Sequence, residues 1–293
     1  MTKICHRSGV ASVPVGRVIG SLTTPASDEL SLEEPLEIRV AEHAENATPT
    51  SVAVTMRTPG DDVELAAGFL FTEGIIAGPD DLEGVERTGP NAVIARLRPG
   101  VAPDPAKLDR HSFVSSSCGA CGKRSIAAVR VLSRHRIVPG EPRIAPEVVH
   151  GLPQALRAGQ SGFARTGGIH ASGLFDATGR LLGLREDVGR HNALDKLIGA
   201  ELLARRIPLA GRLVLVSGRV SFELVQKAAI AGVPMLGAVG APSTLAVDLA
   251  HECGMTLLGF VRDARFNVYS GFGRIDSTDF LTHSAIPNPS TVC

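Results

Sequence analysis

Apolar runs of strand length alternate with helical stretches through the C-terminal part of the chain. RLVLVSG, VPMLGAVG and MTLLGFVR are the apolar runs, and SFELVQKAAIAG and STLAVDLAHECG lie between them with helical periodicity. This alternation predicts a parallel sheet covered on both faces by helices. Ligands of such sheets bind beyond the carboxyl ends of the strands, so the loops that follow the strands should share one rim. These loops are Ser217–Ser221, Val239–Thr244 and Val261–Arg265.

The segment before this alternation has a different pattern. A helix is expected over 146–158, and IHASGLF-DATG-RLLGLRE predicts a β-hairpin that turns at Asp176–Gly179. The next stretch, 188–206, has a helical apolar stripe. That stripe comprises Val188, Leu194, Leu197, Ile198 and Leu202.

The N-terminal part mixes strands with one helix. Strand character is found at Leu36–Ala41, Ser51–Arg57 and Asn91–Arg98, whereas the first twenty-five residues have the pattern of a loose lead-in. A helix is expected over 62–76, capped by Asp61 or Asp62 and ended by Gly78-Pro79. We therefore expect a small α+β domain over 17–112, a junction with a Cys-X-X-Cys loop over 113–145, and an α/β domain over 146–275.

Composition excludes several classes of protein. The 293 residues carry 30 Lys+Arg and 30 Asp+Glu, which argues against a broad nucleic-acid-binding surface. The chain has no Trp and one Tyr, too few aromatic residues for a platform that stacks single-stranded bases.

Neither a membrane span nor a secretory leader is expected. The uncharged stretch 228–247 is interrupted by Pro234 and Pro242, so it predicts two buried elements rather than a spanning helix. The N-terminus lacks the apolar core of a signal peptide, and the five cysteines, an odd number, do not suggest a disulfide framework. We therefore expect a cytoplasmic protein.

The stretch SSSCGACGK contains the most informative pair of side chains, Cys118 and Cys121. A thiolate is the reactive form of cysteine, and backbone amides together with the cations of Lys123 and Arg124 would favour it. Small neighbours leave room for a bulky partner at the sulfur. The pattern favours a thiol that hands sulfur or electrons to another molecule.

Other interpretations of this pair remain open. Half of a zinc site is one of them, since His111 and His135 flank the pair, but no second Cys-X-X-Cys follows at ligand spacing. Thioredoxin-like exchange is another, although the flanking sequence is not typical of that fold. We expect no intrinsic metal.

REDVGRHNALDK carries a second group of chemically interesting residues. Asp187, His191 and Asp195 would share one face if the whole stretch were helical, and His191 beside a carboxylate would suit acid–base or ligand-orienting work. The alternative is a helix N-terminus in which Asp187 is a cap and His191 is structural. TGGIH (166–170) offers a histidine beside a flexible glycine pair, a weak signal alone.

Two of the loops after the apolar strands, SGRVS and VGAPST, suit phosphate. Each opens a helix, and the free amides and dipole of a helix N-terminus attract anions. Arg219, Arg262 and Arg265 would add positive charge. Neither loop is a Walker A or GxGxxG motif, and ordinary turns are the alternative. The candidate ligand-binding residues here are Ser217, Gly218, Arg219, Ser221, Gly240, Ser243 and Thr244, together with His191.

Taken together, SSSCGACGK, TGGIH, REDVGRHNALDK, SGRVSFELVQKAAIAGVP and GFVRDARFNVY resemble the FdhD/NarQ family of formate dehydrogenase accessory sulfurtransferases. The resemblance covers about residues 17–275. It implies a second domain similar to the cytidine deaminase-like fold, three-layered with a mostly parallel sheet. The zinc pattern of the deaminases is absent, so deamination is not carried over.

The resemblance also implies an activity and its partners. Family members accept persulfide sulfur from a cysteine desulfurase of the IscS type and pass it to the bis(molybdopterin guanine dinucleotide) form of the molybdenum cofactor, for use by formate dehydrogenase. The persulfide carrier would be Cys118, with Cys121 as an assisting thiol, and a homodimer is expected at the family level. The segment that matches the binding site for the cofactor and its guanine nucleotide is Phe260, Val261, Arg262, Asp263, Ala264 and Arg265.

Two other functions remain as alternatives. The chain would be a non-catalytic chaperone of the molybdenum cofactor if the cysteines only bind zinc or shape a loop. It would be a metal-independent nucleotide hydrolase if His191 and Asp187 act together.

Overall fold

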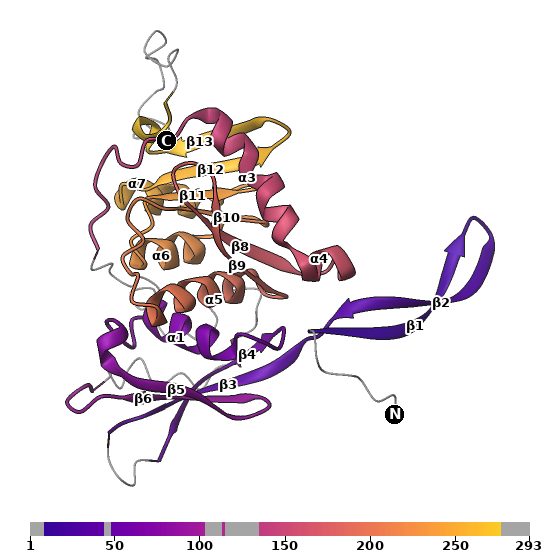
Figure 1. The fold of residues 1–293 in the computed structure, drawn as a ribbon, viewed down its shortest axis with the longest axis horizontal. Coiled ribbons are helices and arrows are strands. Elements are labelled where there is room, and N and C mark those ends of the chain that lie inside the picture. The colour runs from indigo at the N-terminus through magenta and orange to yellow at the C-terminus, as the bar shows by residue number, and fades with distance from the viewer. Residues whose placement is uncertain (1–8, 44–47, 103–112, 115–134, 277–293) are drawn as a thin grey trace.

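The computed structural model describes residues 9–43, 48–102, 113–114 and 135–276, for 113–114 the backbone only. Its strands form a two-stranded ribbon, a five-stranded sheet of order β5-β6-β3-β4-β7 and a six-stranded sheet of order β13-β12-β11-β10-β8-β9 (Figure 1). The division at residues 112 and 146 stays a prediction.

Within the described residues, the N-terminal part contains the ribbon and the five-stranded sheet together with helix α1. The expected strands at 36–41, 51–57 and 91–98 are confirmed as β3, β4 and β6. The described elements are β1 Val10–Ile19, β2 Leu22–Ser31, β3 Glu34–Ala41, β4 Thr50–Arg57, α1 Asp62–Thr72, the 3-10 turn Pro79–Asp81, β5 Leu82–Gly89, β6 Ala92–Leu97 and β7 Phe113–Val114.

Two expectations for this part were wrong. The first twenty-five residues are not a loose lead-in, because β1 pairs with β2 from Val10–Ser31 to Ile19–Leu22. The first helix ends at Thr72, earlier than expected, because Gly74 adopts a positive φ of 68° that ends helices. Asp61 precedes that helix but makes no side-chain capping hydrogen bond.

The C-terminal part is a three-layer α/β/α arrangement, as expected. Its elements are α3 Pro146–Gly159, α4 Ser161–Thr166, β8 His170–Phe175, β9 Leu181–Asp187, α5 Arg190–Leu203, β10 Leu213–Val216, α6 Phe222–Ile230, β11 Met235–Ala238, α7 Thr244–Glu252, β12 Thr256–Arg262, β13 Arg265–Ser270 and the 3-10 turn Phe272–Arg274. The expected parallel pairing holds for β10-β11-β12, whereas β8, β9 and β13 join antiparallel, so the sheet is mixed.

Alternation along the strands explains the layers. In β10, Val214 and Val216 belong to the core shared with α5, α6 and α7, and Leu213 and Leu215 belong to the core beneath α3. A strand that is buried on both faces has a continuous run of apolar residues, and for this reason β10, β11 and β12 could be predicted from the sequence. Figure 1 shows α3 on one side of the sheet and α5 and α6 on the other.

The two large sheets are joined through helices. Helix α1 covers the five-stranded sheet, α5 covers the six-stranded sheet, and the two helices cross at Gly68 and Gly199. A Cβ atom at Gly199 would overlap the carbonyl oxygen of Glu64, and one at Gly68 would overlap that of Asp195. Only glycine permits this separation of the helices, which places the buried charges of both within reach of one another.

Candidate functional site

The three loops expected on one rim are adjacent in the structure. Gly240 donates its N–H to the carbonyl of Gly218 (3.1 Å), and Phe260 donates its N–H to the carbonyl of Gly240 (2.9 Å). Val220 and Pro242 form a further parallel bridge. The prediction that the exits of β10, β11 and β12 share a rim is therefore confirmed.

A cleft of about 730 Å³ opens beside this rim. Its lining comes from α3 and α4 with the residue between them, from residues 167–170, and from the strand exits. The polar and aromatic residues of the lining are Gln154, Arg157, Gln160, Phe163, His170, Ser217, Arg262 and Asp263.

The predicted ligand-binding residues divide into three groups. Ser217, Arg262 and Asp263 line the cleft. Val261 is fully buried in the core beneath α3, so its side chain is structural and does not reach a ligand. The remaining predicted residues belong to the rim without lining this cleft, within the part of the chain that the structure describes. They are Gly218, Arg219, Ser221, Gly240, Ser243, Thr244, Phe260, Ala264 and Arg265, with His191 behind them.

Several rim residues have defined local roles. Ser243 caps α7 by accepting the N–H of Ala246 (3.3 Å), and Thr244 is the first residue of that helix. A Cβ atom at Gly240 would lie 3.0 Å from the Gly218 carbonyl and 3.1 Å from Cγ of Arg219. Close packing of the loops therefore places the base of the exposed Arg219 side chain beside the exit of β11.

The segment Phe260–Arg265 is the tip of the β12–β13 hairpin. Asp263 and Ala264 both have a positive φ, 53° and 52°, and Arg262 pairs with Arg265 on either side. This is the geometry of a two-residue hairpin turn, usually built from Asn and Gly. Phe260 also has a positive φ of 53°. Such strain in non-glycine residues clusters at functional sites, which supports this segment as part of the site.

The cleft contains donors and cations that the sequence did not single out. The Arg157 guanidinium stacks on the Phe163 ring at 4.1 Å. Gln160 is 5% exposed, and its Nε2 atom has no hydrogen-bond partner among the described residues. A buried amide without a partner is costly, and a polar ligand would satisfy it. The sequence signal was the run from Arg157 to His170, of which only TGGIH was noted.

His170 also lines the cleft. Its imidazole lies next to Gly218, since a Cβ atom there would meet the ring at 3.3 Å. Burial, followed by the nearby charge of Arg190, lowers the pKa of His170, with Asp187 opposing the shift. The ring is therefore neutral at pH 7 and serves as a hydrogen-bonding group rather than as a cation.

The motif REDVGRHNALDK is divided between the site and the junction of the two sheets. His191 approaches Ser221 on the rim, with Nε2 3.2 Å from the hydroxyl oxygen, and Glu223 at 3.8 Å. Asp187 ends β9 and α5 begins at Arg190, so the three residues do not share one helical face. The alternative, a helix N-terminus at this point, agrees with the structure, although Gly189 rather than Asp187 is the capping residue. The strand-to-helix turn at Gly189 breaks the helical spacing.

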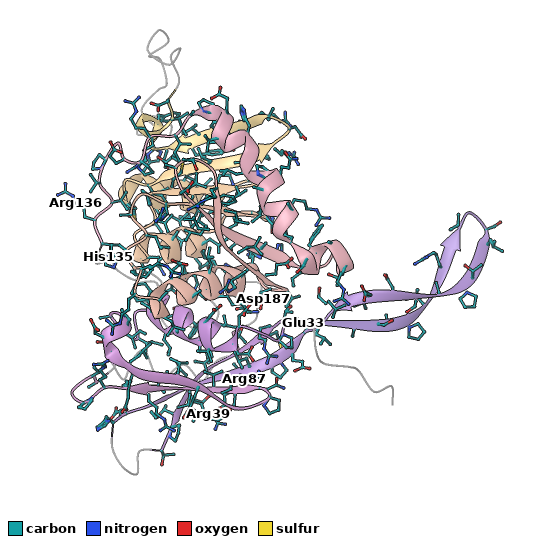
Figure 2. The ribbon with its side chains drawn as sticks, viewed as in Figure 1. Glu33, Arg39, Arg87, His135, Arg136 and Asp187 are labelled. Atoms are coloured by element: carbon teal, nitrogen blue, oxygen red, sulfur yellow. The ribbon has the colours of Figure 1, made fainter. Side chains whose placement is uncertain are left out.

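Asp187 holds the two sheets together (Figure 2). It binds the Lys196 ammonium at 2.8 Å and accepts the N–H of Thr58 at 3.1 Å and of Gly189 at 2.8 Å. Its side chain is fully buried, and burial raises its pKa although Lys196 opposes this. A carboxylate engaged in this way is structural, which removes the basis for a hydrolase that pairs it with His191.

Asp195 has the same kind of role deeper in the junction. The Lys227 ammonium lies 2.8 Å from Asp195 Oδ2, 2.9 Å from the Thr72 hydroxyl and 3.3 Å from a Glu73 carboxylate oxygen. Burial lowers the pKa of Lys227, but the two carboxylates outweigh it and the net direction is upward. Lys227 is therefore charged, and the cluster ties α6, α5 and α1 together.

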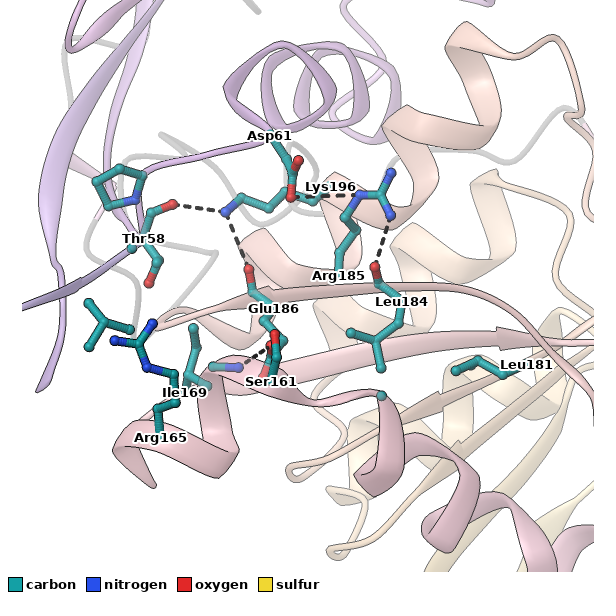
Figure 3. Close-up of a pocket in the computed structure, with 15 residues that line it drawn as sticks. Thr58, Asp61, Ser161, Arg165, Ile169, Leu181, Leu184, Arg185, Glu186 and Lys196 are labelled. Carbon is teal, nitrogen blue, oxygen red and sulfur yellow. Dashed lines mark hydrogen bonds and ion pairs between the residues drawn. The ribbon is translucent and has the colours of Figure 1, made fainter. Parts of the chain in front are cut away.

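A second cavity, of about 750 Å³, lies at the edge of the junction (Figure 3). Its charged side chains already have partners: Lys196 donates to the Thr58 carbonyl at 2.9 Å, and Arg185 binds Glu64. Glu186 accepts the N–H of Gly162 at 2.8 Å at the start of α4. The charged residues of this cavity therefore stabilise the contact between the two parts of the chain and are not available to bind a ligand.

The predicted catalytic residues Cys118 and Cys121 lie outside the described residues. The last described residues before them, β7, pair with β4, with Val114 beside Thr55. The Thr55 hydroxyl donates to Asn192 (3.3 Å), the neighbour of His191 in α5. Val114, the last described residue before the cysteines, therefore lies close to α5, the helix whose His191 contacts the rim.

Within the described ranges, no group of three or more His, Cys, Asp and Glu side chains is placed to hold a metal ion. No helix in those ranges combines the length and the apolar character that crossing a membrane requires.

Known proteins similar to this chain cover nearly its whole length. "Sulfur carrier protein FdhD" of Streptomyces avermitilis is 48% identical over 94% of this chain and 97% of that protein, and the protein of the same name from Mycobacterium tuberculosis is 46% identical over 85% and 92%. A crystal structure from Desulfotalea psychrophila, described as a formate dehydrogenase accessory protein, shares the fold with a TM-score of 0.67 at 22% identity, covering 91% of this chain and 99% of that one. A model of the FdhD/NarQ family matches residues 31–276, which contain both the cleft and the cysteine pair. On this match and these identities, the chain belongs to the FdhD/NarQ family.

Proposed function

We propose that this protein is a sulfur carrier that takes persulfide sulfur from a cysteine desulfurase and delivers it to the molybdenum cofactor for formate dehydrogenase. The observation that carries the proposal is the 46–48% identity, over most of the chain, to relatives named as sulfur carrier proteins. Two further observations support the proposal: the cleft could hold a ligand, and the sequence contains the thiols of Cys118 and Cys121.

The proposed sulfurtransferase chemistry uses the two cysteines in turn. The Cys118 thiolate attacks the terminal sulfur of the persulfide on an IscS-type desulfurase. A new S–S bond forms, the donor S–S bond breaks, and the donor cysteine leaves as a thiolate. The Cys121 thiolate then attacks the Cys118 sulfur, which expels the carried atom as hydrosulfide to the acceptor and leaves a Cys118–Cys121 disulfide. A thiol reductant must return both cysteines to thiols before the next cycle.

The cleft suits a guanine dinucleotide of the kind found in the bis(molybdopterin guanine dinucleotide) cofactor, which we write as substrate. Arg157 and Arg262 both line the cleft and would bind diphosphate oxygens. The unpartnered Gln160 amide and the neutral His170 ring would form hydrogen bonds with the guanine base. The Phe163 side chain gives the cleft an aromatic surface.

Chain geometry is compatible with transfer between the thiols and this rim. Cys118 follows Val114 by four residues, and four extended residues span at most about 14 Å. Val114 pairs with Thr55, which is hydrogen-bonded to α5 next to His191. His191 in turn contacts Ser221 on the rim.

The experiment is a persulfide assay on the full-length protein. Incubation with a cysteine desulfurase and cysteine should add the mass of one sulfur atom to the peptide that contains Cys118. Cys118→Ala should abolish both the adduct and the activation of formate dehydrogenase. Cys121→Ala should keep the adduct but slow its discharge, and Cys253→Ala, which removes a thiol elsewhere in the fold, should behave as wild type.

The same assay decides against the alternative. If Cys118→Ala activates formate dehydrogenase fully, sulfur carriage through this residue is refuted. Stoichiometric zinc bound by both cysteines in freshly purified protein, without any sulfur adduct, would establish the non-catalytic cofactor chaperone instead.

A further inference from the structure

The turn that joins β9 to α5 forms part of the cleft beside the rim. Val188 of this turn is one of the residues that line the cleft. Asp187, the residue before it, lies opposite His170 in the pairing of β8 with β9, and His170 lines the cleft as well. The position of this turn therefore determines the shape of the cleft at both Val188 and His170.

Thr58, from the N-terminal part of the chain, contacts this turn and the helix after it with all three of its polar groups. Its hydroxyl oxygen accepts the N–H of Val188 (3.1 Å), and its own N–H donates to Asp187 Oδ2 (3.1 Å). Its carbonyl accepts from the ammonium of Lys196 (2.9 Å), which also binds Asp187 (Figure 3). Thr58 is 6% exposed and is not among the residues that line the cleft. Its contacts therefore reach the cleft only through the turn.

The Val188 N–H is satisfied from outside its own strand and helix. Val188 follows the last residue of β9 and precedes α5, and the acceptor of its N–H is the Thr58 hydroxyl. A partly buried donor that loses its acceptor is costly, so the backbone is expected to move until the N–H reaches water or another oxygen. Loss of the Thr58 hydroxyl should therefore displace Val188 from its place in the lining of the cleft.

The end of β4, which Thr58 directly follows, is itself held against α5. The Asn192 amide nitrogen donates to the Met56 carbonyl (2.8 Å), and the amide oxygen accepts the Thr55 hydroxyl (3.3 Å). These contacts fix β4 relative to the first turn of α5. Thr58 is therefore a fixed point against which the β9–α5 turn is placed, and it does not simply follow the turn when the turn moves.

Thr72 provides a comparison within the same junction. Its hydroxyl donates to Asp195 (2.8 Å) and accepts from the Lys227 ammonium (2.9 Å), and neither partner is among the residues that line the cleft. Both threonines are buried, and both join the two parts of the chain. Of these two, Thr58 is the one that bonds directly to a residue of the cleft lining.

We propose that Thr58 is a positioning residue of the cleft, whose hydroxyl holds Val188 where the ligand of the cleft requires it. The residues that line the cleft belong to the C-terminal part of the chain, so Thr58 makes ligand binding depend on the contact between the two parts. The identity of the ligand rests on the proposed function, whereas the hydrogen bond to Val188 can be measured without any ligand.

Thr58→Val tests the proposal on the full chain, because valine has nearly the same shape but lacks the acceptor oxygen. Amide hydrogen exchange of Val188, followed by nuclear magnetic resonance, should become about tenfold faster than in wild type. The Kd for guanosine diphosphate, measured by isothermal titration, should rise about fivefold. Thr58→Ser restores the acceptor and should return both values to near those of wild type. If circular dichroism shows that Thr58→Val does not fold, Thr58→Ala removes the same oxygen without adding a methyl group in its place.

Thr72→Val is the matched control, since it removes a buried hydroxyl from the same junction. It should lower stability but leave the Val188 exchange rate and the affinity for guanosine diphosphate as in wild type. Unchanged exchange at Val188 in the Thr58 variant overturns the proposal, and so does faster exchange with unchanged affinity. A wild type that does not bind guanosine diphosphate refutes the guanine nucleotide of the proposed function instead, and the exchange at Val188 then decides the role of Thr58.

Discussion

Gly68 of α1 and Gly199 of α5 lie against each other where the helices cross, so closely that neither position has room for a methyl group. This contact joins the helix of the five-stranded sheet to the helix of the six-stranded sheet. The polar clusters around Asp187 and Lys227 surround it, which makes the crossing the structural centre of the junction.

Substitution of Gly199 by alanine should destabilise the protein severely. The added methyl group would overlap the Glu64 carbonyl, and helices must separate to relieve it. Overpacking of this kind costs about 1–3 kcal/mol or more of the free energy of unfolding, measurable by urea denaturation. Gly151→Ala in α3, where an added Cβ meets no atom within 4 Å, is the control and should be neutral or stabilising. Equal stability of the two variants would contradict the close crossing.

Removal of the Lys227 ammonium should be costly in a different way. Lys227→Met leaves the Asp195 carboxylate buried without its cation, and breaking a buried pair on one side costs about 3–5 kcal/mol. Arg205→Met removes an exposed pair with Asp80 and should cost about 1 kcal/mol or less. The comparison is made by chemical denaturation at pH 7, and similar losses in both variants would argue against a charged cluster.

The cleft should bind guanosine diphosphate, the nucleotide portion of the proposed substrate. Arg262→Gln removes a cation from the wall and should weaken binding about tenfold, a change of about 1.4 kcal/mol. Arg212→Gln, exposed at the opposite end of β10, should leave the affinity unchanged. Isothermal titration at two salt concentrations measures both. Equal affinities in the two variants would remove Arg262 from the site.

His170 should make stability depend on pH. Its pKa is lowered in the folded protein, so as the pH falls below about 6.5 the unfolded chain takes up a proton that the folded chain resists. The contribution of His170 is therefore fully present above that pH and is lost progressively on acidification. Urea unfolding at pH 7.5 and pH 5.5 should show a smaller acid loss for His170→Asn than for wild type. His251→Asn, at an exposed position on α7, should retain the wild-type loss.

Elements that are buried on all sides could be predicted from the sequence. The strands β10, β11 and β12 are buried on both faces, so Leu213–Val216 and its neighbours form apolar runs. Because ligands of parallel sheets bind beyond the carboxyl ends of the strands, the same runs also predicted the rim on which Ser217 and Arg262 lie. The ribbon was missed because Pro14, Gly16 and Pro25 weaken its strand signal and because most of it is exposed.

The roles within REDVGRHNALDK required the tertiary structure. Spacing alone placed Asp187 and Asp195 on one helical face, but the helix begins only at Arg190. Their partners Lys196 and Lys227 were not singled out, since nothing local shows that α1 packs over them. Gln160 was missed for the same reason, because an unpartnered amide is defined by what surrounds it.

The charge clusters at the helix crossing also bear on how such a chain can evolve. Lys227 and Asp187 come from one half of the molecule, whereas Thr72, Glu73 and Thr58 come from the other. The N-terminal half alone would leave Glu73 without the Lys227 ammonium, and the C-terminal half alone would leave Lys227 and Asp187 without their hydrogen bonds to Thr72 and Thr58. Recombination that replaced one half with an unrelated sequence would therefore be selected against, and the two halves should be inherited together as a single unit.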